Sequence, residues 1–425
     1  MNLLLQTSKA DLQAQIAVTG SKSETNRLLL LKALFSNITL ANTSNSDDSE
    51  VMEKALVIDS QLPSETSGSN SQLPTSNFQL IDIHHAGTAM RFLTAYFAVN
   101  EGREVILTGS PRMKERPIKI LVDALLQLGS KIEYLENEGF PPIKISGQKL
   151  VQSKVSLPAS VSSQYISALL LVAPKLENGL ELKLEGSVTS IPYIKMTLAL
   201  LNDLKIQTSF EGNVIKVYPK PAVESKVMTV ESDWSSASYF FSLVALSNQA
   251  SISLTSYKET SLQGDSALVE IYSKMGVETR FEENKITLVK KPNFKLETLN
   301  LDLNNTPDIA QTIVVTCLGL GIGCQLKGLH TLKIKETDRL EALRIELTKL
   351  GANISVTNDS LTLVATQSIN SNVKIATYND HRMAMAFAPL ALKVPIIIEN
   401  AEVVSKSYPD FWEDFKNLSF KIFEI

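Results

Sequence analysis

The sequence has few cysteines, histidines and aromatic residues, and each shortage excludes a class of protein. Its two cysteines, Cys317 and Cys324, form no CxxC motif and lie in an apolar stretch, so we expect buried thiols in a reducing compartment. The four histidines show neither HxxxH nor HExxH spacing, and no metal site is predicted. Aromatic residues make up 6% of the chain, which disfavours an RNA-binding surface built on exposed rings.

An excess of one charge and a long hydrophobic run are also missing. Lys and Arg number 41 against 45 Asp and Glu, for a net charge of -4, so no overall field attracts nucleic acid or an anionic membrane. The longest apolar stretch, residues 312–323, is too short to cross a bilayer, and the first residues do not resemble a signal peptide. We therefore expect a cytoplasmic protein that binds neither nucleic acid nor membrane.

An amphipathic segment recurs along the chain. Its copies end at Ser60, Gly129, Asp203, Gly276, Gly351 and Ser419. Each copy has the 3.6-residue apolar period of a helix, several lead into a β-branched run, and a second, more apolar helical segment precedes each one. A repeat of about 70 residues is too long for a solenoid. The pattern predicts an α/β fold of six β-α-β-α-β-β units, three in each of two globules. Residues 60–77, rich in Ser, Pro and Gly, are expected to form a surface loop.

Cations recur beside the predicted helix starts. They are Lys22, Arg27, Arg116, Lys335, Arg339, Arg382 and Lys406. Free N–H groups and the helix dipole favour an anion at such places, and guanidinium groups bind phosphate and carboxylate bidentately. The recurrence predicts a site for a polyanionic small molecule, and solvated surface charge is the alternative.

Three short strings sharpen this prediction. The string GSKSETNR at 20–27 opens a helix with hydroxyls and two cations, but it lacks the P-loop spacing, which disfavours a nucleotide triphosphatase. The string VSSQ at 161–164 offers hydroxyl and amide donors, although serines at a helix start can be simple N-caps. The string KETDR at 335–339 sets Glu336 between two cations, which would keep it ionised; a surface salt-bridge cluster is the alternative.

Together, seven motifs resemble those of the 5-enolpyruvylshikimate-3-phosphate (EPSP) synthase family. They are GSKS at 20–23, AGTAMR at 86–91, PRMKERP at 111–117, SSQ at 162–164, PD at 307–308, KETDR at 335–339 and YNDHRMA at 378–384. The resemblance implies transfer of the enolpyruvyl group of phosphoenolpyruvate to the 5-hydroxyl of shikimate 3-phosphate, with release of phosphate, in the shikimate pathway to chorismate and aromatic amino acids.

The resemblance also implies an inverse α/β barrel of two globules. We expect residues 1–19 plus 233–425 in the first globule and residues 20–232 in the second, with the active site in the cleft between them. The globules should close on the substrates. No cofactor is implied, and we expect a monomer.

Site residues follow from the same resemblance, motif by motif. Shikimate 3-phosphate is assigned to Lys22, Ser23, Arg27, Ser162, Ser163, Gln164, Ser190, Tyr193, Asp308 and Lys335. Phosphoenolpyruvate is assigned to Lys22, Gly87, Arg116, Gln164, Arg339, Arg382 and Lys406. Proton transfer needs an acid and a base within reach, so Asp308 is expected at the target hydroxyl, and Glu336 with Lys22 at the phosphoenolpyruvate side.

Three residues depart from the family's motifs, and one related activity competes. His85 stands where many members have Asn, Phe92 where Pro is common, and Thr331 where some have Asn. These departures concern local hydrogen bonding and the pitch of one helix. The related UDP-N-acetylglucosamine enolpyruvyl transferase uses a cysteine in a mobile loop, and residues 111–117 contain none. A non-catalytic anion- or RNA-binding module is the alternative from another class.

Overall fold

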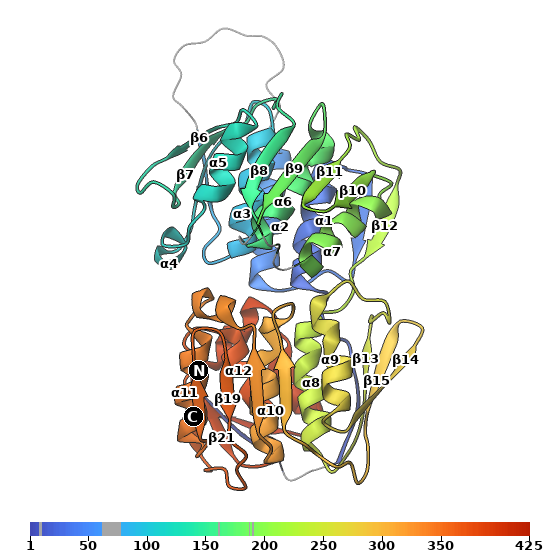
Figure 1. Cartoon of the computed structure of the whole chain (residues 1–425), viewed down its shortest axis with the longest axis vertical. Coiled ribbons are helices and arrows are strands. Elements are labelled where there is room, and N and C mark those ends of the chain that lie inside the picture. The colour runs from blue at the N-terminus through green and yellow to red at the C-terminus, as the bar shows by residue number, and fades with distance from the viewer. Residues whose placement is uncertain (8–10, 62–77, 160–161, 187, 189–190) are drawn as a thin grey trace. The chain divides into compact units, whose positions relative to one another are not determined.

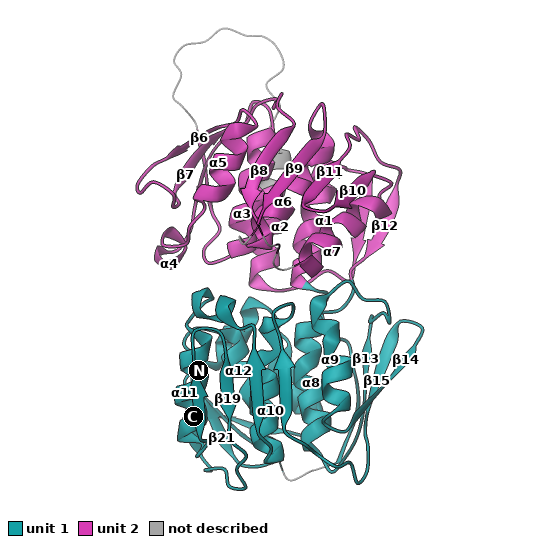
Figure 2. Cartoon of the chain, in the orientation of Figure 1, with its two compact units in different colours: residues 1–21, 231–425 teal, residues 22–230 magenta. Residues whose placement is uncertain are grey.

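The computed structural model describes residues 1–7, 11–61, 78–159, 162–186, 188 and 191–425. The chain divides into two compact units, shown in separate colours in Figure 2. Unit 1 comprises Met1–Ser21 and Glu231–Ile425, and unit 2 comprises Lys22–Val230. The boundaries expected from the sequence, after residues 19 and 232, differ from these by two residues at each crossing.

Within the described residues, five four-stranded sheets share one strand order. In each, the first two strands pair in parallel, and two antiparallel strands follow the second. Unit 2 holds β4 (Gln79–Asp82)-β5 (Glu104–Thr108)-β7 (Ile143–Ser146)-β6 (Lys131–Tyr134) and β8 (Lys154–Pro158)-β9 (Leu180–Glu185)-β11 (Val214–Val217)-β10 (Thr208–Glu211). Its third sheet, of two parallel strands, is β12 (Lys226–Thr229)-β3 (Ile38–Ala41).

The three sheets of unit 1 repeat the same order. They are β2 (Asp11–Ile16)-β13 (Gln249–Thr255)-β15 (Lys285–Lys290)-β14 (Val277–Glu282), then β16 (Leu299–Asp302)-β17 (Cys324–Lys327)-β19 (Leu361–Leu363)-β18 (Ile354–Val356), and β20 (Val373–Ile375)-β21 (Ile396–Ile398)-β1 (Leu3–Gln6)-β22 (Lys421–Glu424). Both ends of the chain therefore lie in one sheet, where β1 pairs with β22, as the N and C marks of Figure 1 show.

Each unit encloses three apolar helices that contact one another directly or through a following 3-10 turn. They are α1 (Lys22–Leu34), α3 (Gly87–Val99) and α6 (Ser163–Val172) in unit 2, and α8 (Trp234–Leu246), α10 (Ala310–Leu320) and α12 (His381–Phe387) in unit 1. Nearly every residue of α3, α6 and α8 is buried, because a helix that is apolar all round must be covered on every side. Figure 1 shows α8 and α10 side by side.

The amphipathic segments found in the sequence form a second set of helices. They are α2 (Asp47–Gln61), α5 (Lys119–Gln127), α7 (Ile191–Asp203), α9 (Leu268–Ser273), α11 (Arg339–Lys349) and α13 (Phe411–Asn417). Each predicted helical segment is thus present, and the α/β fold class is confirmed. The predicted loop at 60–77 is partly wrong, because Ser60 and Gln61 continue α2; residues 62–77 lie outside the described residues.

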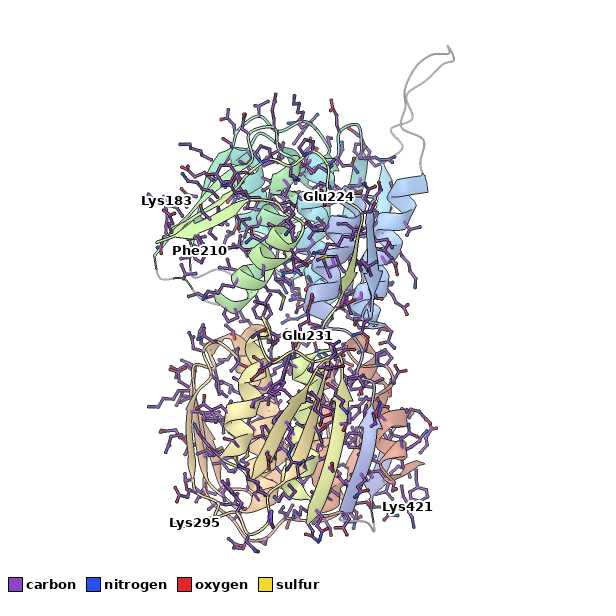
Figure 3. All side chains as sticks on the ribbon, turned by 90° about the vertical axis from the view of Figure 1, so that its right-hand side faces the viewer. Lys183, Phe210, Glu224, Glu231, Lys295 and Lys421 are labelled. Carbon is purple, nitrogen blue, oxygen red and sulfur yellow. The ribbon has the colours of Figure 1, made fainter. Side chains whose placement is uncertain are left out.

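The chain leaves and re-enters unit 1 at adjacent points. Gly20 and Ser232 form an antiparallel bridge, and the Ser21 amide donates to the Glu231 carbonyl at 2.8 Å. The Glu231 carboxylate, labelled in Figure 3, accepts from the Trp234 indole and from Ser261 at 2.8 and 2.7 Å. Both crossings are therefore anchored in unit 1 at one place.

Candidate functional site

Arg339 is the centre of a charged cluster in unit 1. It is the first residue of α11, and Asp338 caps that helix by accepting from the Glu341 amide at 3.2 Å. Its guanidinium donates to Asp380 Oδ2 at 2.6 Å, Asp308 Oδ1 at 2.9 Å and Glu336 Oε2 at 2.9 Å. Three carboxylates from three chain segments are thus fixed around one planar cation.

Asp308 lies in the 3-10 turn η3 (Pro307–Ile309) and faces three cations. Lys335 Nζ is 3.2 Å from its Oδ1, and Arg382 Nη2 is 3.7 Å from its Oδ2. Burial alone would raise the pKa of Asp308, but Lys335, Arg382 and Arg339 outweigh it and hold the pKa well below its usual range. The carboxylate is therefore ionised at neutral pH and able to accept a proton.

Arg382 is the second residue of α12, and Asp380 caps this helix by accepting from the Arg382 amide at 2.9 Å. Its guanidinium donates to the Asp308 carbonyl at 3.3 Å and to Ser235 Oγ at 3.2 Å. Burial lowers the pKa of Arg382, but nearby Asp308 and other acids raise it well above its usual value. The group is a permanent cation.

Lys406 differs from its expected position at a helix start. It is the last residue of the 3-10 helix η6 (Ala401–Lys406), and its amine donates to the Asn379 carbonyl at 2.6 Å. Asn379 precedes Asp380 in the sequence, so Lys406 contacts the backbone next to the charged cluster and none of the cluster's side chains named above. The structure thus brings Asp308, Lys335, Glu336, Arg339 and Arg382 together, with Lys406 next to them along the chain.

In unit 2, Lys22 and Arg27 share α1 but have different environments. Lys22, the first residue of α1, pairs with Asp48 at 3.3 Å and keeps 21% of its side chain exposed. Arg27 is buried one turn further into α1, and it donates to Thr197 Oγ1 at 2.8 Å and Ser167 Oγ at 2.9 Å. Burial lowers the pKa of Arg27 to about 10, which leaves it protonated at neutral pH.

Two aromatic rings and one serine complete the surroundings of Arg27. Its guanidinium carbon lies 5.5 Å from the centre of the Phe92 ring and 5.8 Å from that of Tyr193. Its Nη1 donates to the carbonyl of Ser23 at 2.6 Å. Of the residues assigned to shikimate 3-phosphate, Lys22, Ser23, Arg27 and Tyr193 thus gather at α1, while Ser190 lies outside the described residues.

Gly87 and Arg116 lie against one another. A Cβ atom at Gly87 would be 2.4 Å from Arg116 Nη1 and 2.7 Å from Nη2, so only glycine leaves room for this guanidinium. The next residue, Thr88, accepts from Gln164 Nε2 at 3.1 Å. Three residues assigned to phosphoenolpyruvate or to both substrates are therefore neighbours at the start of α3.

The serines before Gln164 divide into a cap and a buried residue. Ser162 is exposed and caps α6 by accepting from the Gln164 amide at 3.3 Å. Ser163 is buried as the first residue of α6. The N-cap alternative considered from the sequence therefore applies to Ser162 in this structure.

Four polar residues of these clusters were not among the sequence candidates. Asp380 and Arg91 belong to the motifs quoted above, Asp48 lies with Asp47 in the acidic first turn of α2, and Asp265, described below, is a single charge with no local pattern. Arg91 is buried and donates to the Gly87 carbonyl at 3.0 Å and to the Pro117 carbonyl at 2.9 Å. An acid capping a helix that begins with a candidate cation is the signal that would have found Asp380.

The three residues that depart from the family motifs have different environments. Helix α3 continues through Phe92, which is fully buried, so its pitch is uninterrupted there. His85 is exposed before that helix. Thr331 has a buried hydroxyl with no hydrogen-bond partner among the described residues.

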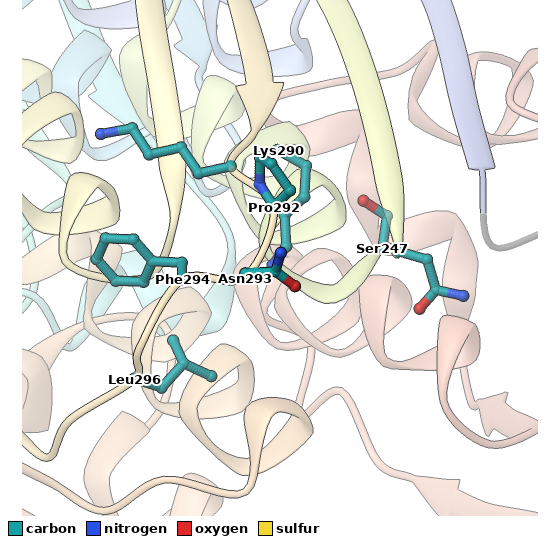
Figure 4. A pocket seen from close by; sticks show the side chains of 8 residues that line it. Ser247, Lys290, Pro292, Asn293, Phe294 and Leu296 are labelled. Carbon is teal, nitrogen blue, oxygen red and sulfur yellow. The ribbon is translucent and has the colours of Figure 1, made fainter.

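A hollow of about 300 Å³ in unit 1 is separate from these clusters. Ser247, Lys290, Lys291 and Phe294 line it (Figure 4). Ser247 ends α8 while Ser235 lies near its start, so about 18 Å of helix separates them. Lys290 donates to the Ala245 carbonyl and neutralises the negative end of the α8 dipole.

The described residues contain neither a membrane-spanning helix nor a metal-binding cluster. No helix among them is long and apolar enough to cross a membrane. No group of three His, Cys, Asp or Glu side chains among them is arranged to hold a metal ion. Cys317 and Cys324 are buried free thiols, and a hydrogen bond between them, together with burial, raises the pKa of Cys317 well above its usual value.

Comparison with known proteins gives the family. The model of the family "EPSP synthase (3-phosphoshikimate 1-carboxyvinyltransferase)" matches residues 6–415. A 3-phosphoshikimate 1-carboxyvinyltransferase of Bacteroides fragilis strain YCH46 is 45% identical, over 98% of each chain. Another, of Colwellia psychrerythraea, is 36% identical, over 96% of this chain and 97% of the relative. An EPSP synthase structure from Acinetobacter baumannii shares the fold, with a TM-score of 0.79 over both full chains at 20% identity.

An α/β transferase with clustered cations in each unit is the class that these findings define. The chain belongs to the EPSP synthase family. It is accordingly a transferase of the 3-phosphoshikimate 1-carboxyvinyltransferase type, in the shikimate pathway of aromatic amino-acid biosynthesis. The predictions of family, reaction and enzyme class made from the motifs are confirmed.

Proposed function

We propose that this chain joins phosphoenolpyruvate to shikimate 3-phosphate through the residues described above. In the addition step the methylene carbon of phosphoenolpyruvate gains a proton, and the 5-hydroxyl oxygen attacks the neighbouring carbon and loses its own proton. In the elimination step the tetrahedral ketal loses phosphate and a methyl proton, which restores the double bond. Atoms and charge balance without a cofactor.

The observation that carries the proposal is Asp308, an ionised carboxylate fixed among three cations. Its low pKa makes it a weak base in the free protein, and bound anions that offset the charge of Lys335 and Arg382 would raise that pKa. We assign Asp308 to the proton of the 5-hydroxyl, and Glu336 with Lys22 to the phosphoenolpyruvate side. Arg339 and Arg382 would stabilise charge that develops on the leaving phosphate.

Unit 2 supplies the second set of anion-binding residues in this proposal. Arg27 donates to two hydroxyls and one backbone carbonyl, all of them neutral acceptors, and we assign it to shikimate 3-phosphate with Lys22, Ser23 and Tyr193. We assign Arg116, beside Gly87, to phosphoenolpyruvate. We further propose that both sets act on one pair of substrates, in a cytoplasmic monomer.

A coupled phosphate-release assay tests the reaction. Phosphate should be released from phosphoenolpyruvate with shikimate 3-phosphate and not with UDP-N-acetylglucosamine; the reverse preference would overturn the proposal. Asp308→Ala and Glu336→Ala should each lower kcat by on the order of 10². If either variant turns over like the wild type at neutral pH, that carboxylate is a structural partner of Arg339 instead.

A further inference from the structure

Asp265 is a buried carboxylate beside the charged cluster of unit 1, and the roles assigned above do not use it. It lies in the 3-10 helix η2 (Gly264–Ala267) with 5% of its surface exposed. Its Oδ2 accepts a hydrogen bond from Ser235 Oγ and its Oδ1 accepts one from Thr306 Oγ1. Each carboxylate oxygen thus holds one hydroxyl.

The first of these hydroxyls leads to Arg382. Ser235 is the second residue of α8, and its oxygen accepts from Arg382 Nη2 at 3.2 Å while its hydrogen is directed to Asp265. The guanidinium, the hydroxyl and the carboxylate form one chain of hydrogen bonds in which each bond polarises the next. Asp265 therefore orients the acceptor that holds one end of Arg382.

The second hydroxyl leads to Asp308. Thr306 is buried, precedes the turn η3 and lies two residues before Asp308. Its amide donates to the Leu303 carbonyl at 3.0 Å and its hydroxyl is held by Asp265. The start of the turn is therefore fixed on two sides, and with it the backbone from which the Asp308 side chain projects.

Stability does not explain a carboxylate at this position. Burial and the nearby charge of Asp308 raise the pKa of Asp265. Arg382 and the two hydroxyls lower this pKa, but they offset the increase only in part. A buried acid whose direct partners are neutral hydroxyls costs free energy relative to an apolar residue. Its useful property is that two acceptor oxygens in one rigid plane orient two hydroxyls at once.

We propose that Asp265 is a positioning residue for enolpyruvyl transfer, setting Arg382 through Ser235 and Asp308 through Thr306. This inference rests on the proposed function for the roles of Arg382 and Asp308. One side chain would thus hold in place both Arg382, the cation at the leaving phosphate, and Asp308, the group that accepts the proton.

Substitution of Asp265 by its amide tests the proposal. In Asp265→Asn one carboxylate oxygen is replaced by an NH2 group, which cannot accept a hydrogen bond from a hydroxyl. Either the hydrogen bond from Ser235 or the one from Thr306 must therefore be lost or rearranged. We expect kcat to fall and the KM for phosphoenolpyruvate to rise, each about tenfold, the change that about 1.4 kcal/mol produces. The matched control is Glu270→Gln on α9, where an exposed carboxylate pairs with Lys274 at 3.1 Å; it should change neither parameter.

Two further variants test the connection through Ser235 and the connection through Thr306 separately. Ser235→Ala should raise the KM for phosphoenolpyruvate and also lower kcat, because Arg382 is assigned to the leaving phosphate, whereas Thr306→Val should lower kcat with that KM unchanged. A merely structural role predicts instead the same loss of active protein and of melting temperature in both variants, with every KM unchanged. That pattern, or wild-type kinetics in Asp265→Asn, would overturn the proposal.

A readout independent of turnover distinguishes this inference from the proposed function. In a crystal structure of Asp265→Asn, the Arg382 guanidinium or the turn at Asp308 should be displaced. If both keep their contacts, Asp265 does not position them, whatever the activity. If instead the wild type releases no phosphate from the substrate pair, the proposed function fails, and the crystal structure still decides whether Asp265 positions the two groups.

Discussion

Arg339 and Asp380 form an ion pair that is almost completely withdrawn from solvent. Arg339 Nε lies 2.6 Å from Asp380 Oδ2, and 2% and 0% of the two side chains are exposed. The pair joins the first turn of α11 to the first turn of α12, and Asp380 also caps the helix that carries Arg382. One carboxylate therefore aligns two candidate phosphate-binding cations.

Loss of Asp380 should destabilise unit 1 strongly. Asp380→Ala leaves the buried Arg339 guanidinium without its closest partner, and breaking a buried pair costs about 3–5 kcal/mol. Urea unfolding should show a much lower midpoint. In the control Glu341→Ala, which breaks an exposed pair with Arg344 on the same helix, the change should stay below about 1 kcal/mol. Equal, small shifts in both variants would contradict a stabilising role for the buried pair.

Asp308 should make stability depend on pH in the acid range. Its pKa in the folded protein is well below the usual value, against about 3.9 for an unfolded Asp. The unfolded chain binds the proton first, so the stabilisation is complete above about pH 4 and is lost as pH falls towards the folded pKa. The free energy of unfolding of Asp308→Asn should therefore fall less steeply below pH 4.

Asp265 should make stability depend on pH in the opposite direction. Its pKa is raised in the folded protein, so its contribution is present at low pH and is lost as pH rises through the folded value. Asp265→Asn should remove a decline in stability above about pH 4 and should not flatten the acid limb. For Asp308, an identical fall in the free energy of unfolding below pH 4 in the wild type and in Asp308→Asn would show that its pKa is unperturbed.

Substitution of Gly87 should weaken binding of phosphoenolpyruvate selectively. The new Cβ of Gly87→Ala would lie 2.4 Å from Arg116 Nη1, so the end of this flexible side chain must move while the backbone can stay. We expect the KM for phosphoenolpyruvate to rise about tenfold or more, which corresponds to about 1.4 kcal/mol. The KM for shikimate 3-phosphate is the internal control, and an equal rise in both would point to a general disturbance of α3.

Lys22 and Arg27 should respond differently to substitution. Lys22 is partly exposed and paired with Asp48, so Lys22→Met should leave the fold intact and lower kcat. Arg27 is buried in unit 2, so Arg27→Ala should raise the KM for shikimate 3-phosphate and also lower the melting temperature, because it leaves a cavity. Steady-state kinetics and thermal unfolding check both; mild, equal effects of Lys22→Met on kcat and KM would contradict its assignment.

Periodicity in the sequence was sufficient to predict the helices of each unit. The amphipathic segments that became α5 and α11 and the apolar segments that became α8 and α10 carry that period within a dozen residues, so local composition determines them. Motif cations such as Arg339 and Arg382 could be predicted because they lie beside helix starts that are visible in the sequence.

Long-range pairing and isolated charges could not be predicted in this way. Strand β2 pairs with β13, whose residues are far away in the sequence. Neither strand contains a sequence feature that identifies the strand with which it pairs. Asp265 functions through Ser235 and Thr306 on other elements, so no window of sequence contains the pattern. The surroundings of Lys406 could not be predicted, because it ends a 3-10 helix and donates to the Asn379 carbonyl, a backbone group 27 residues away in the sequence.

The division of the chain also sets the order in which its parts are completed on the ribosome. Unit 2 is one continuous segment, Lys22–Val230, so all its strands have emerged before most of unit 1 is translated, and domains generally fold as units during synthesis. Strand β2 must wait for β13, and β1 must wait for β21 and for β22 at the last residues. Strand β1, which is synthesised first, is therefore the last to gain both of its neighbours, whereas β2 stays unpaired only until β13 has emerged.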